Sequence, residues 1–171
     1  MFKYRRGNAK PLRAVDIAAS VGLGGLHAAD ARAAMVEDWG SNTYGQIGIG
    51  TTTNITSPAA PTGMSSGVTA VAGGGNHSLS VQNGTVYAWG RNESGQLGNG
   101  TTTNSTTPVA VTGLTDVTAV AGGGAHSLAI KNGGVYAWGS NFVGQLGDGT
   151  TTTSSTPVAV SILTTGVTAI A

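Results

Sequence analysis

The stretch Trp89-Gly-Arg-Asn-Glu-Ser-Gly-Gln-Leu-Gly-Asn-Gly100 decides the fold, because the chain contains it in three versions. It occurs earlier as Trp39-Gly-Ser-Asn-Thr-Tyr-Gly-Gln-Ile-Gly-Ile-Gly50 and later as Trp138-Gly-Ser-Asn-Phe-Val-Gly-Gln-Leu-Gly-Asp-Gly149. Successive tryptophans are 50 and then 49 residues apart. Self-similarity at a fixed period is typical of repeat architectures, in which each repeat is one supersecondary unit that buries its apolar face against its neighbours.

Each unit is predicted to contain four short strands. Residues 68–72 and 77–81 are expected to form the first two, and the pair Asn83-Gly84 that follows is the strongest short signal for a hairpin. The third strand is expected at 86–89 and the fourth at 108–111, whose leading proline fits an outer edge strand. Four strands per unit of about 50 residues, repeated in tandem, predict an all-β fold of β-propeller blades. A superhelical β-solenoid is the weaker alternative, because its coils are usually shorter and carry fewer hairpins.

The repeated residues resemble a known family. The run Trp-Gly-x-Asn-x-x-Gly-Gln-Leu-Gly-x-Gly, then Pro-Val, then Val-Ala-Gly-Gly-Gly-x-His-Ser-Leu is similar to the repeat of the regulator of chromosome condensation family. The resemblance covers residues 39–171, which we divide into 39–88, 89–137 and a partial unit 138–171. That family forms seven-bladed propellers, so the resemblance implies blades of four antiparallel strands here.

Residues 1–38 match the repeat poorly and are interpreted as a degenerate or capping N-terminal unit. His27 precedes Trp39 by 12 residues, which is the spacing found in the other units. The alanine-rich stretch 28–36 favours a helix by intrinsic propensity, however, and lacks the Asn-Gly pair. The local structure of this unit is therefore left open by the sequence.

The number of repeats is too small for the complete ring of that family. About three blades are expected, and an open stack of blades exposes an apolar face at each end, which natural proteins avoid. We therefore expect an incomplete ring that is completed either by self-association or by the rest of a longer chain.

The composition excludes several classes of protein. The chain has 29 glycines, no cysteine and 9% charged residues, against roughly 25% in an average globular domain. Without cysteine there is no disulfide scaffold, zinc ribbon or thiol chemistry. From Gly40 onward there are two basic residues and three acidic ones, which argues against nucleic-acid binding because that needs a basic surface.

The location of the protein is left open by the sequence. No apolar run reaches the roughly 20 residues of a transmembrane helix. There is no clear signal peptide, so a cytoplasmic and an exported or cell-surface location both stay open.

The repeated histidines and tryptophans are predicted to be structural. Equivalent positions in different blades surround an axis and are typically too far apart to hold one metal ion at about 2 Å from each nitrogen. Each histidine is expected to bond the backbone of a neighbouring blade, and each indole to fill the gap between blades with its N–H on a carbonyl oxygen. The residues concerned are His27, His77, His126, Trp39, Trp89 and Trp138.

No catalytic, cofactor-binding or metal-binding residue is predicted. Gly63-Met-Ser-Ser-Gly67 matches the letters of a nucleophile elbow, but it lies between predicted strands, whereas that elbow joins a strand to a helix. The glycine triplets 73–75 and 122–124 are better explained by the close approach of inner strands near the propeller axis.

Candidate partner-binding residues lie where the repeats differ, because the repeated residues are needed to build the blade. The loop that follows each Trp-Gly pair varies most, and it carries aromatic and charged side chains suited to anchoring a partner. The candidates are Tyr44, Arg91, Glu93 and Phe142.

Together these observations predict a non-enzymatic β-propeller scaffold that binds a protein partner of unknown identity through its variable loops. The resemblance implies one alternative, a guanine-nucleotide exchange factor for a small GTPase, although the inserted wedge and basic segments of such a factor have no match here. A second alternative is an exported or cell-surface adhesion or inhibitory propeller. Low charge and abundant threonine suit that role, and the segment Gly67-Val-Thr-Ala-Val-Ala72 is similar to one in a secreted bacterial β-lactamase inhibitor.

Overall fold

The chain folds into three antiparallel sheets of four strands each. The computed structural model describes residues 19–21, 24–29 and 35–171, with side chains from Val36 onward, and in this part of the chain every regular element is a strand. We call the sheets blade 1, blade 2 and blade 3. Blade 1 contains β1 (Ala19–Val21), β2 (Gly24–Ala29), β3 (Met35–Gly40) and β4 (Ile55–Ala59); blade 2 contains β5 (Val68–Gly73), β6 (His77–Gln82), β7 (Thr85–Gly90) and β8 (Ser105–Ala110); blade 3 contains β9 (Val117–Gly122), β10 (His126–Lys131), β11 (Gly134–Gly139) and β12 (Ser154–Ala159).

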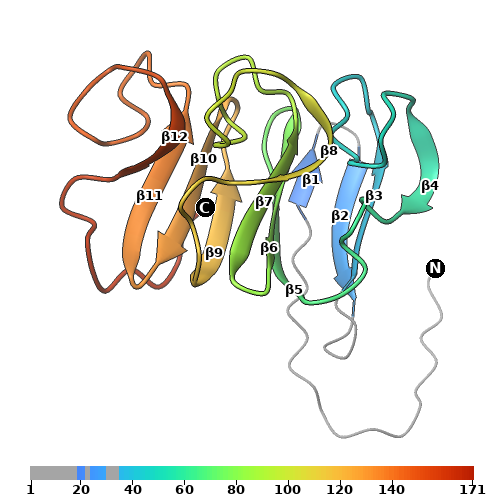
Figure 1. Ribbon diagram of the computed structural model, residues 1–171, viewed down its shortest axis with the longest axis horizontal. Helices are drawn as coiled ribbons and strands as arrows, with labels where there is room; N and C mark the ends of the chain where they lie inside the picture. The colour runs from blue at the N-terminus through green and yellow to red at the C-terminus, as the bar shows by residue number, and fades with distance from the viewer. Residues whose placement is uncertain (1–18, 22–23, 30–34) are drawn as a thin grey trace, which may run out of the picture.

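The three blades stand side by side along the long axis, in chain order from blade 1 at the right of Figure 1 to blade 3 at the left. In each blade the strands follow one another across the sheet without a crossover, from the first strand at one edge to the fourth at the other. Within the described residues the stack does not close into a ring. The predicted all-β fold, with propeller blades of four antiparallel strands in an incomplete ring, is therefore confirmed.

The Asn-Gly pairs form the tight hairpins that the sequence predicts. Asn83 and Gly84 have φ of 50° and 77°, and Asn132 and Gly133 have φ of 51° and 75°. Positive φ at both central residues matches the right-handed twist of the flanking strands, which a two-residue hairpin needs. In blade 2 the hairpin places Gln82 opposite Thr85.

The outer strands begin earlier than predicted. β8 starts at Ser105, three residues before Pro108, and Ser105 pairs with Gly90 after an irregularity in the register between Ala88 and Gly90. Gly90 has φ of 103°, a conformation that L side chains rarely adopt, and this bend lets the pairing continue past the proline. Pro108 itself lies on the edge strand β8, where the ladder does not need its missing N–H.

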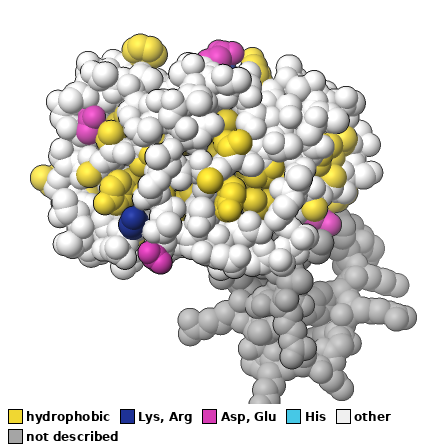
Figure 2. Space-filling model, in the orientation of Figure 1, with side chains coloured by type: hydrophobic (Ala, Val, Ile, Leu, Met, Phe, Trp, Pro, Cys, Tyr) yellow, Lys and Arg dark blue, Asp and Glu magenta, His cyan; other side chains and the backbone are white. Residues whose placement is uncertain are grey.

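The core lies between the blades rather than within any one of them. The face of blade 2 that carries Leu79, Val81 and Val86 packs against Val120 and Trp138 of blade 3, and all five are buried. Figure 2 shows hydrophobic side chains gathered in a band across the visible face, with few charged groups around it. Because each sheet buries its apolar surface against an adjacent sheet, each blade depends on its neighbours for stability.

The inner strands of blades 2 and 3 approach each other closely at their glycines. Gly75 N donates to Gly123 O at 3.0 Å. A Cβ atom on Gly74 would lie 2.7 Å from Gly123 O, and one on Gly122 would lie 2.7 Å from Gly73 O. Only glycine fits at such contacts, which is the role that the sequence analysis gave to the triplets.

Blade 1 contains strands where composition favours a helix. Ala28 and Ala29 lie on β2 and pair with Val36 and Met35 of β3, while residues 30–34 lie outside the described residues. Helix propensity differs by only tenths of a kcal/mol among ordinary residues, so backbone pairing with β3 is enough to override it. The register also sets β4 beside β3, with Asp38 opposite Ala59.

Candidate protein-interaction surface

The variable loops are held rigidly by a repeated asparagine. In blade 2, Asn92 Oδ1 accepts from Leu97 N at 2.9 Å, and Asn92 Nδ2 donates to Thr101 O and Thr103 O at 3.0 Å. Gln96 Oε1 accepts from Ser94 N at 2.9 Å. Asn92 is fully buried, so the loop is braced from within and its outer side chains are free of that task.

The same bracing recurs in the other two loops. Asn42 Oδ1 accepts from Ile47 N, and Asn141 Oδ1 accepts from Leu146 N, both at 2.9 Å. In the third loop Asp148 also accepts hydrogen bonds from the backbone and side chain of Thr150, which hold the pKa of that exposed carboxyl below its ordinary value.

Three of the four predicted partner-binding residues lie together across the boundary between blades 1 and 2. The guanidinium carbon of Arg91 lies 5.3 Å from the ring centroid of Tyr44, within the range of a cation–π contact. Arg91 Nε donates to Glu93 Oε2 at 3.1 Å, and a second N–H of the guanidinium reaches the same oxygen. These bonds raise the pKa of Arg91 further, so the group stays charged.

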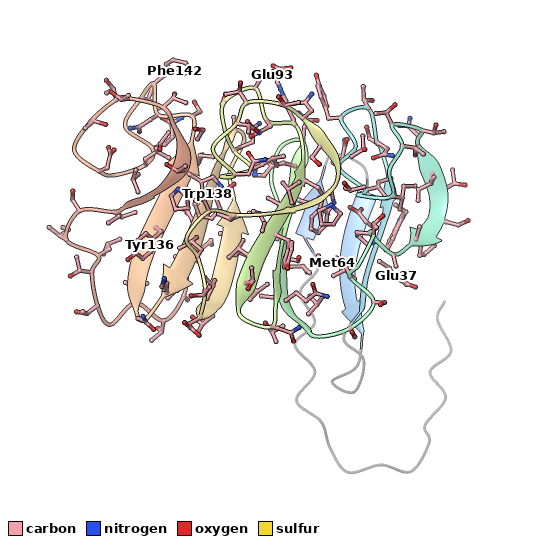
Figure 3. The ribbon with its side chains drawn as sticks, in the orientation of Figure 1. Glu37, Met64, Glu93, Tyr136, Trp138 and Phe142 are labelled. Carbon is pink, nitrogen blue, oxygen red and sulfur yellow. The ribbon has the colours of Figure 1, made fainter. Side chains whose placement is uncertain are left out.

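Phe142 lies on the corresponding loop of blade 3 and points into solvent. Figure 3 shows Phe142 and Glu93 at the same edge of the molecule, on the loops of neighbouring blades. The Phe142 side chain is 77% exposed and the adjacent Val143 is 86% exposed. Val143 was not among the candidates chosen from the sequence, although its neighbour was. We define the loop surface as Tyr44, Arg91, Glu93, Phe142 and Val143.

The repeated tryptophans and serines join each blade to the preceding one. Trp138 Nε1 and Ser127 Oγ of blade 3 each donate to Gln96 O of blade 2 at 2.8 Å. Trp89 Nε1 and Ser78 Oγ of blade 2 likewise donate to one backbone oxygen of blade 1, that of Gln46, at 2.8 Å. We call this arrangement of an indole and a hydroxyl on one carbonyl oxygen the blade joint.

His77 extends the joint between blades 2 and 3. Its Nε2 lies 2.8 Å from Ser127 Oγ, so its partner is a side-chain hydroxyl rather than the backbone group expected from the sequence. Because the single proton of that hydroxyl goes to Gln96 O, His77 donates from Nε2 and its Nδ1 carries no proton. Burial, with a smaller effect of His126, lowers the pKa of His77 to about 4.

Two of the other repeated residues, His126 and Trp39, are less enclosed than His77. His126 is half-buried, and burial lowers its pKa by itself. Trp39 lies half-buried on β3 of blade 1. His27 lies on β2 opposite Glu37, and its side chain lies outside the described residues.

The buried carboxyl of Asp38 is a feature that the sequence analysis missed. Asp38 is 3% exposed, and its Oδ2 has no hydrogen-bond partner among the described residues. Burial raises its pKa from 3.8 to about 7, against a smaller opposite effect of the Trp39 backbone N–H. The signal was available, since the equivalent positions in blades 2 and 3 are Ala88 and Ala137.

Among the described residues, the structure assigns no reactive site to the other sequence motifs. The Gly63–Gly67 stretch forms turns between β4 and β5, and Ser65 is exposed beside the buried Met64. Over the described ranges no three His, Asp or Glu side chains gather as a metal site would require. Within the same part of the chain no helix is long and apolar enough to span a bilayer.

The family model described as "Regulator of chromosome condensation (RCC1) repeat" matches residues 39–81, 83–130 and 132–171 of the sequence. A second family model of the same repeat matches residues 68–96 and 117–145. The chain belongs to the RCC1 repeat family. The Trp-Gly loops, hairpins and blade joints described above therefore lie within its RCC1 repeats. No curated protein matches the sequence.

Solved structures of larger proteins share the fold. The chain is similar to human WBSCR16, with 26% identity and a TM-score of 0.73 over 92% of this chain and 40% of that one. It is similar to Prp20p of Saccharomyces cerevisiae, with 22% identity and a TM-score of 0.72 over 85% of this chain and 38% of that one. Yeast RCC1 (Prp20) bound to Kap60 gives 22% identity and a TM-score of 0.71 over 85% and 36%. The chain thus spans about two fifths of the length of the structures it matches.

Proposed function

We propose that this chain is a non-enzymatic RCC1-type scaffold that binds a protein partner through the loop surface. The observation that carries the proposal is the outward display of Phe142 and Val143 beside the Tyr44–Arg91 pair, on loops that other residues already brace. Aromatic and arginine side chains provide most hot spots in protein interfaces. A rigid loop also binds with a smaller loss of conformational entropy than a flexible one.

The braced loops and the blade joints form without the side chains of the loop surface. Loop bracing is carried out by Asn42, Asn92 and Asn141 together with the following glutamine, and joint formation by the tryptophans. The exposed apolar groups at 142 and 143 therefore stay in water unless a partner covers them. Structures of similar proteins include one described with its binding to Gsp1p and histones and one bound to Kap60, so protein binding is known among relatives of the fold.

The test compares wild type with the double variant Phe142→Ser, Val143→Ser in quantitative affinity capture, followed by reconstitution with each purified candidate. The matched control is Ser65→Ala, an exposed change between blades 1 and 2 and outside the loop surface. We expect at least one purified protein to bind wild type and the control, and to lose about thirtyfold or more in affinity for the double variant. Equal binding by all three chains would refute the role of the loop surface.

Guanine-nucleotide exchange is the second candidate, because the similar Prp20p is described by its binding to Gsp1p. The measurement is the release of a fluorescent guanine nucleotide from purified Gsp1p with and without this chain. Acceleration that falls in the loop-surface variant would favour exchange over plain scaffolding. An unchanged release rate would leave scaffolding as the better proposal. The exported adhesion or inhibitory role stays a prediction from the sequence.

A further inference from the structure

The edge of the stack opposite the loop surface carries a second set of positions at which the repeats differ. Figure 1 shows the β6–β7 and β10–β11 hairpins at this edge, whereas Figure 3 shows Phe142 and Glu93 at the other. The segments that leave the three outer strands run beside these hairpins. We call this region the lower edge and define it as residues 62–67, 83–84, 112–116, 131–133 and 161–166.

The connecting segments and the hairpins alternate along the lower edge. The hairpin of blade 2 lies against the first segment, since Asn83 N donates to Gly67 O at 3.0 Å. On its other side it lies against the second segment, because a Cβ added to Gly84 would be 3.4 Å from Asp116 N.

The hairpin of blade 3 is placed in the same way between the second and third segments. On one side, Lys131 Nζ donates to Gly113 O at 3.2 Å. On the other side, Val167 N, directly after the third segment, donates to Gly133 O at 2.9 Å. The order along the lower edge is therefore first segment, blade 2 hairpin, second segment, blade 3 hairpin and third segment.

Ile162 in the third segment is an unusual residue for its backbone conformation. Its φ is 61°, in the left-handed region that β-branched residues very rarely adopt. The equivalent residues are Gly63 and Gly113, and each of these is followed by a complete blade. A Cβ added to either would meet nothing within 4 Å, so a side chain at this position projects away from the stack.

The isoleucine therefore has a cost without a visible return in its own chain. Its side chain is 95% exposed. Backbone strain of this kind is typical of functional contacts, and an exposed apolar group is stabilised when a partner covers it. Ile162 is thus suited to anchor a contact made by the lower edge.

Two opposite charges lie on the same edge. Asp116 and Lys131 are the charged residues of the lower edge, and within the described residues neither forms an ion pair. Asp116 is exposed and has φ of 58°, where the other two segments have Gly67 and Gly166. Figure 2 shows a basic and an acidic group close together at the lower edge of blade 3.

This pattern of charges is complementary to itself in reverse order. A two-fold axis between Asp116 and Lys131 brings Asp116 of one copy to Lys131 of another, and the second pair forms at the same time because a two-fold contact is reciprocal. The same rotation exchanges the blade 2 hairpin with the third segment, since each lies one step outside the charged pair. Ile162 of each copy then lies against the Asn83-Gly84 turn of the other.

We propose that two copies of this chain associate through their lower edges in this antiparallel arrangement. The contact consists of two Asp116–Lys131 pairs at the centre and an Ile162 anchor on each side. It leaves the loop surface of each copy uncovered at the opposite edge, so it does not depend on the proposed function. Two loop surfaces in one assembly also allow it to hold two partner molecules at once.

The first experiment measures the mass of the full chain by sedimentation over a concentration series. We expect a reversible species with twice the mass of one chain and no larger one, because a two-fold contact closes on itself. Lys131→Glu and Asp116→Lys should each raise the dissociation constant about tenfold, since symmetry counts every lost pair twice. Circular dichroism verifies that each variant stays folded.

Charge exchange gives the decisive comparison. The double variant Lys131→Glu, Asp116→Lys restores both pairs with reversed polarity, and so does an equimolar mixture of the two single variants. Both should regain the association of wild type. The matched control is Glu93→Lys, which makes the same charge change as Asp116→Lys at the opposite edge and should leave the dissociation constant unchanged.

Ile162 gives an independent test with two readouts of opposite sign. Ile162→Gly removes the anchor and the backbone strain together, so the dissociation constant should rise about thirtyfold. At a concentration where the chain is monomeric, the same variant should have an equal or higher Tm than wild type. A lower Tm with unchanged association would mean that Ile162 acts within its own chain and would overturn its role as an anchor.

The remaining outcomes also decide the question. A chain that stays monomeric at every concentration, or one that grows beyond two copies, would overturn the proposal. Self-association that is unaffected by both single charge variants would place the contact elsewhere on the molecule. Association that neither the double variant nor the mixture regains would refute the pairing of Asp116 with Lys131.

Discussion

Replacement of the buried carboxyl at position 38 should stabilise the protein and remove a dependence of its stability on pH. Asp38 stands where blades 2 and 3 have Ala88 and Ala137, both fully buried. Its side chain is 3% exposed, and Oδ2 has no hydrogen-bond partner among the described residues. A charged carboxylate in such a place loses its hydration without a compensating contact, which is why burial raises its pKa.

The magnitude follows from the pKa shift. The pKa of Asp38 rises from 3.8 to about 7, and one unit corresponds to about 1.4 kcal/mol. Since the folded state then binds the proton more tightly than the unfolded state, the free energy of unfolding falls as pH rises from about 4 to about 7. The loss amounts to about 4 kcal/mol and is complete above the folded-state pKa. Asp38→Ala removes this loss, so the variant should be the more stable chain at pH 8, with little difference near pH 4.

The assay is urea unfolding followed by tryptophan fluorescence, at pH 5, 6, 7 and 8, for wild type, Asp38→Ala and Asp38→Asn. His77 acts in the opposite direction below pH 6.5, so only the difference between variant and wild type isolates Asp38. Glu93→Gln is the control for an exposed acid. A difference in unfolding free energy that stays constant between pH 5 and pH 8 would refute the reasoning.

Three further predictions concern the blade joint. Ser127→Ala should cost about 1–3 kcal/mol of unfolding free energy, measured in urea, because it strips His77 Nε2 of its only partner. The pKa of His77 is lowered to about 4, so the unfolded chain binds more protons between pH 4 and 6.5 and this residue's contribution to stability falls with the pH; His77→Asn should flatten that part of the urea profile. Gly98→Ala should destabilise strongly, because its φ is 68° and its Cβ would lie 2.7 Å from the Trp138 indole, and thermal unfolding should give a lower Tm than for Gly113→Ala.

Matched comparisons decide each of these three outcomes. For Ser127→Ala, an unchanged urea midpoint would contradict the donor role of His77. A stability profile that is the same in His77→Asn as in wild type between pH 4 and 6.5 would contradict its low pKa. For the glycines, Gly113 has φ of 72° with nothing within 4 Å of an added Cβ, so it isolates backbone strain from the clash with the indole.

The local structure of the repeats was predictable because short-range signals specify it. The Asn83-Gly84 pair requires a tight hairpin whatever the rest of the chain does, and its positive φ values were expected. Pro108 was correctly placed on an edge strand because a missing donor is tolerated only there. The same approach left residues 28–36 open, and at the described positions 28–29 and 35–36 weak helix propensity was overridden by pairing between β2 and β3.

The role of the indoles between blades was predicted, but the identity of the residues that meet across blades was not predictable from any single repeat. Tyr44 and Arg91 are distant in sequence, and only the stacking of blades 1 and 2 brings the guanidinium to 5.3 Å from the ring. The partner of His77 was expected to be backbone and is instead Ser127 of the next blade. These pairs depend on how one sheet is rotated and shifted against the next, which local propensity does not encode.

The sequence by itself determined the blade: its four strands, its hairpins and the period at which it recurs. Only the tertiary structure decided which groups each blade supplies to the next and where burial leaves a group unsatisfied, as at Asp38 Oδ2. The physical reason is that strand and turn preferences act within a few residues, whereas burial and hydrogen bonding between sheets exist only once the sheets are packed together.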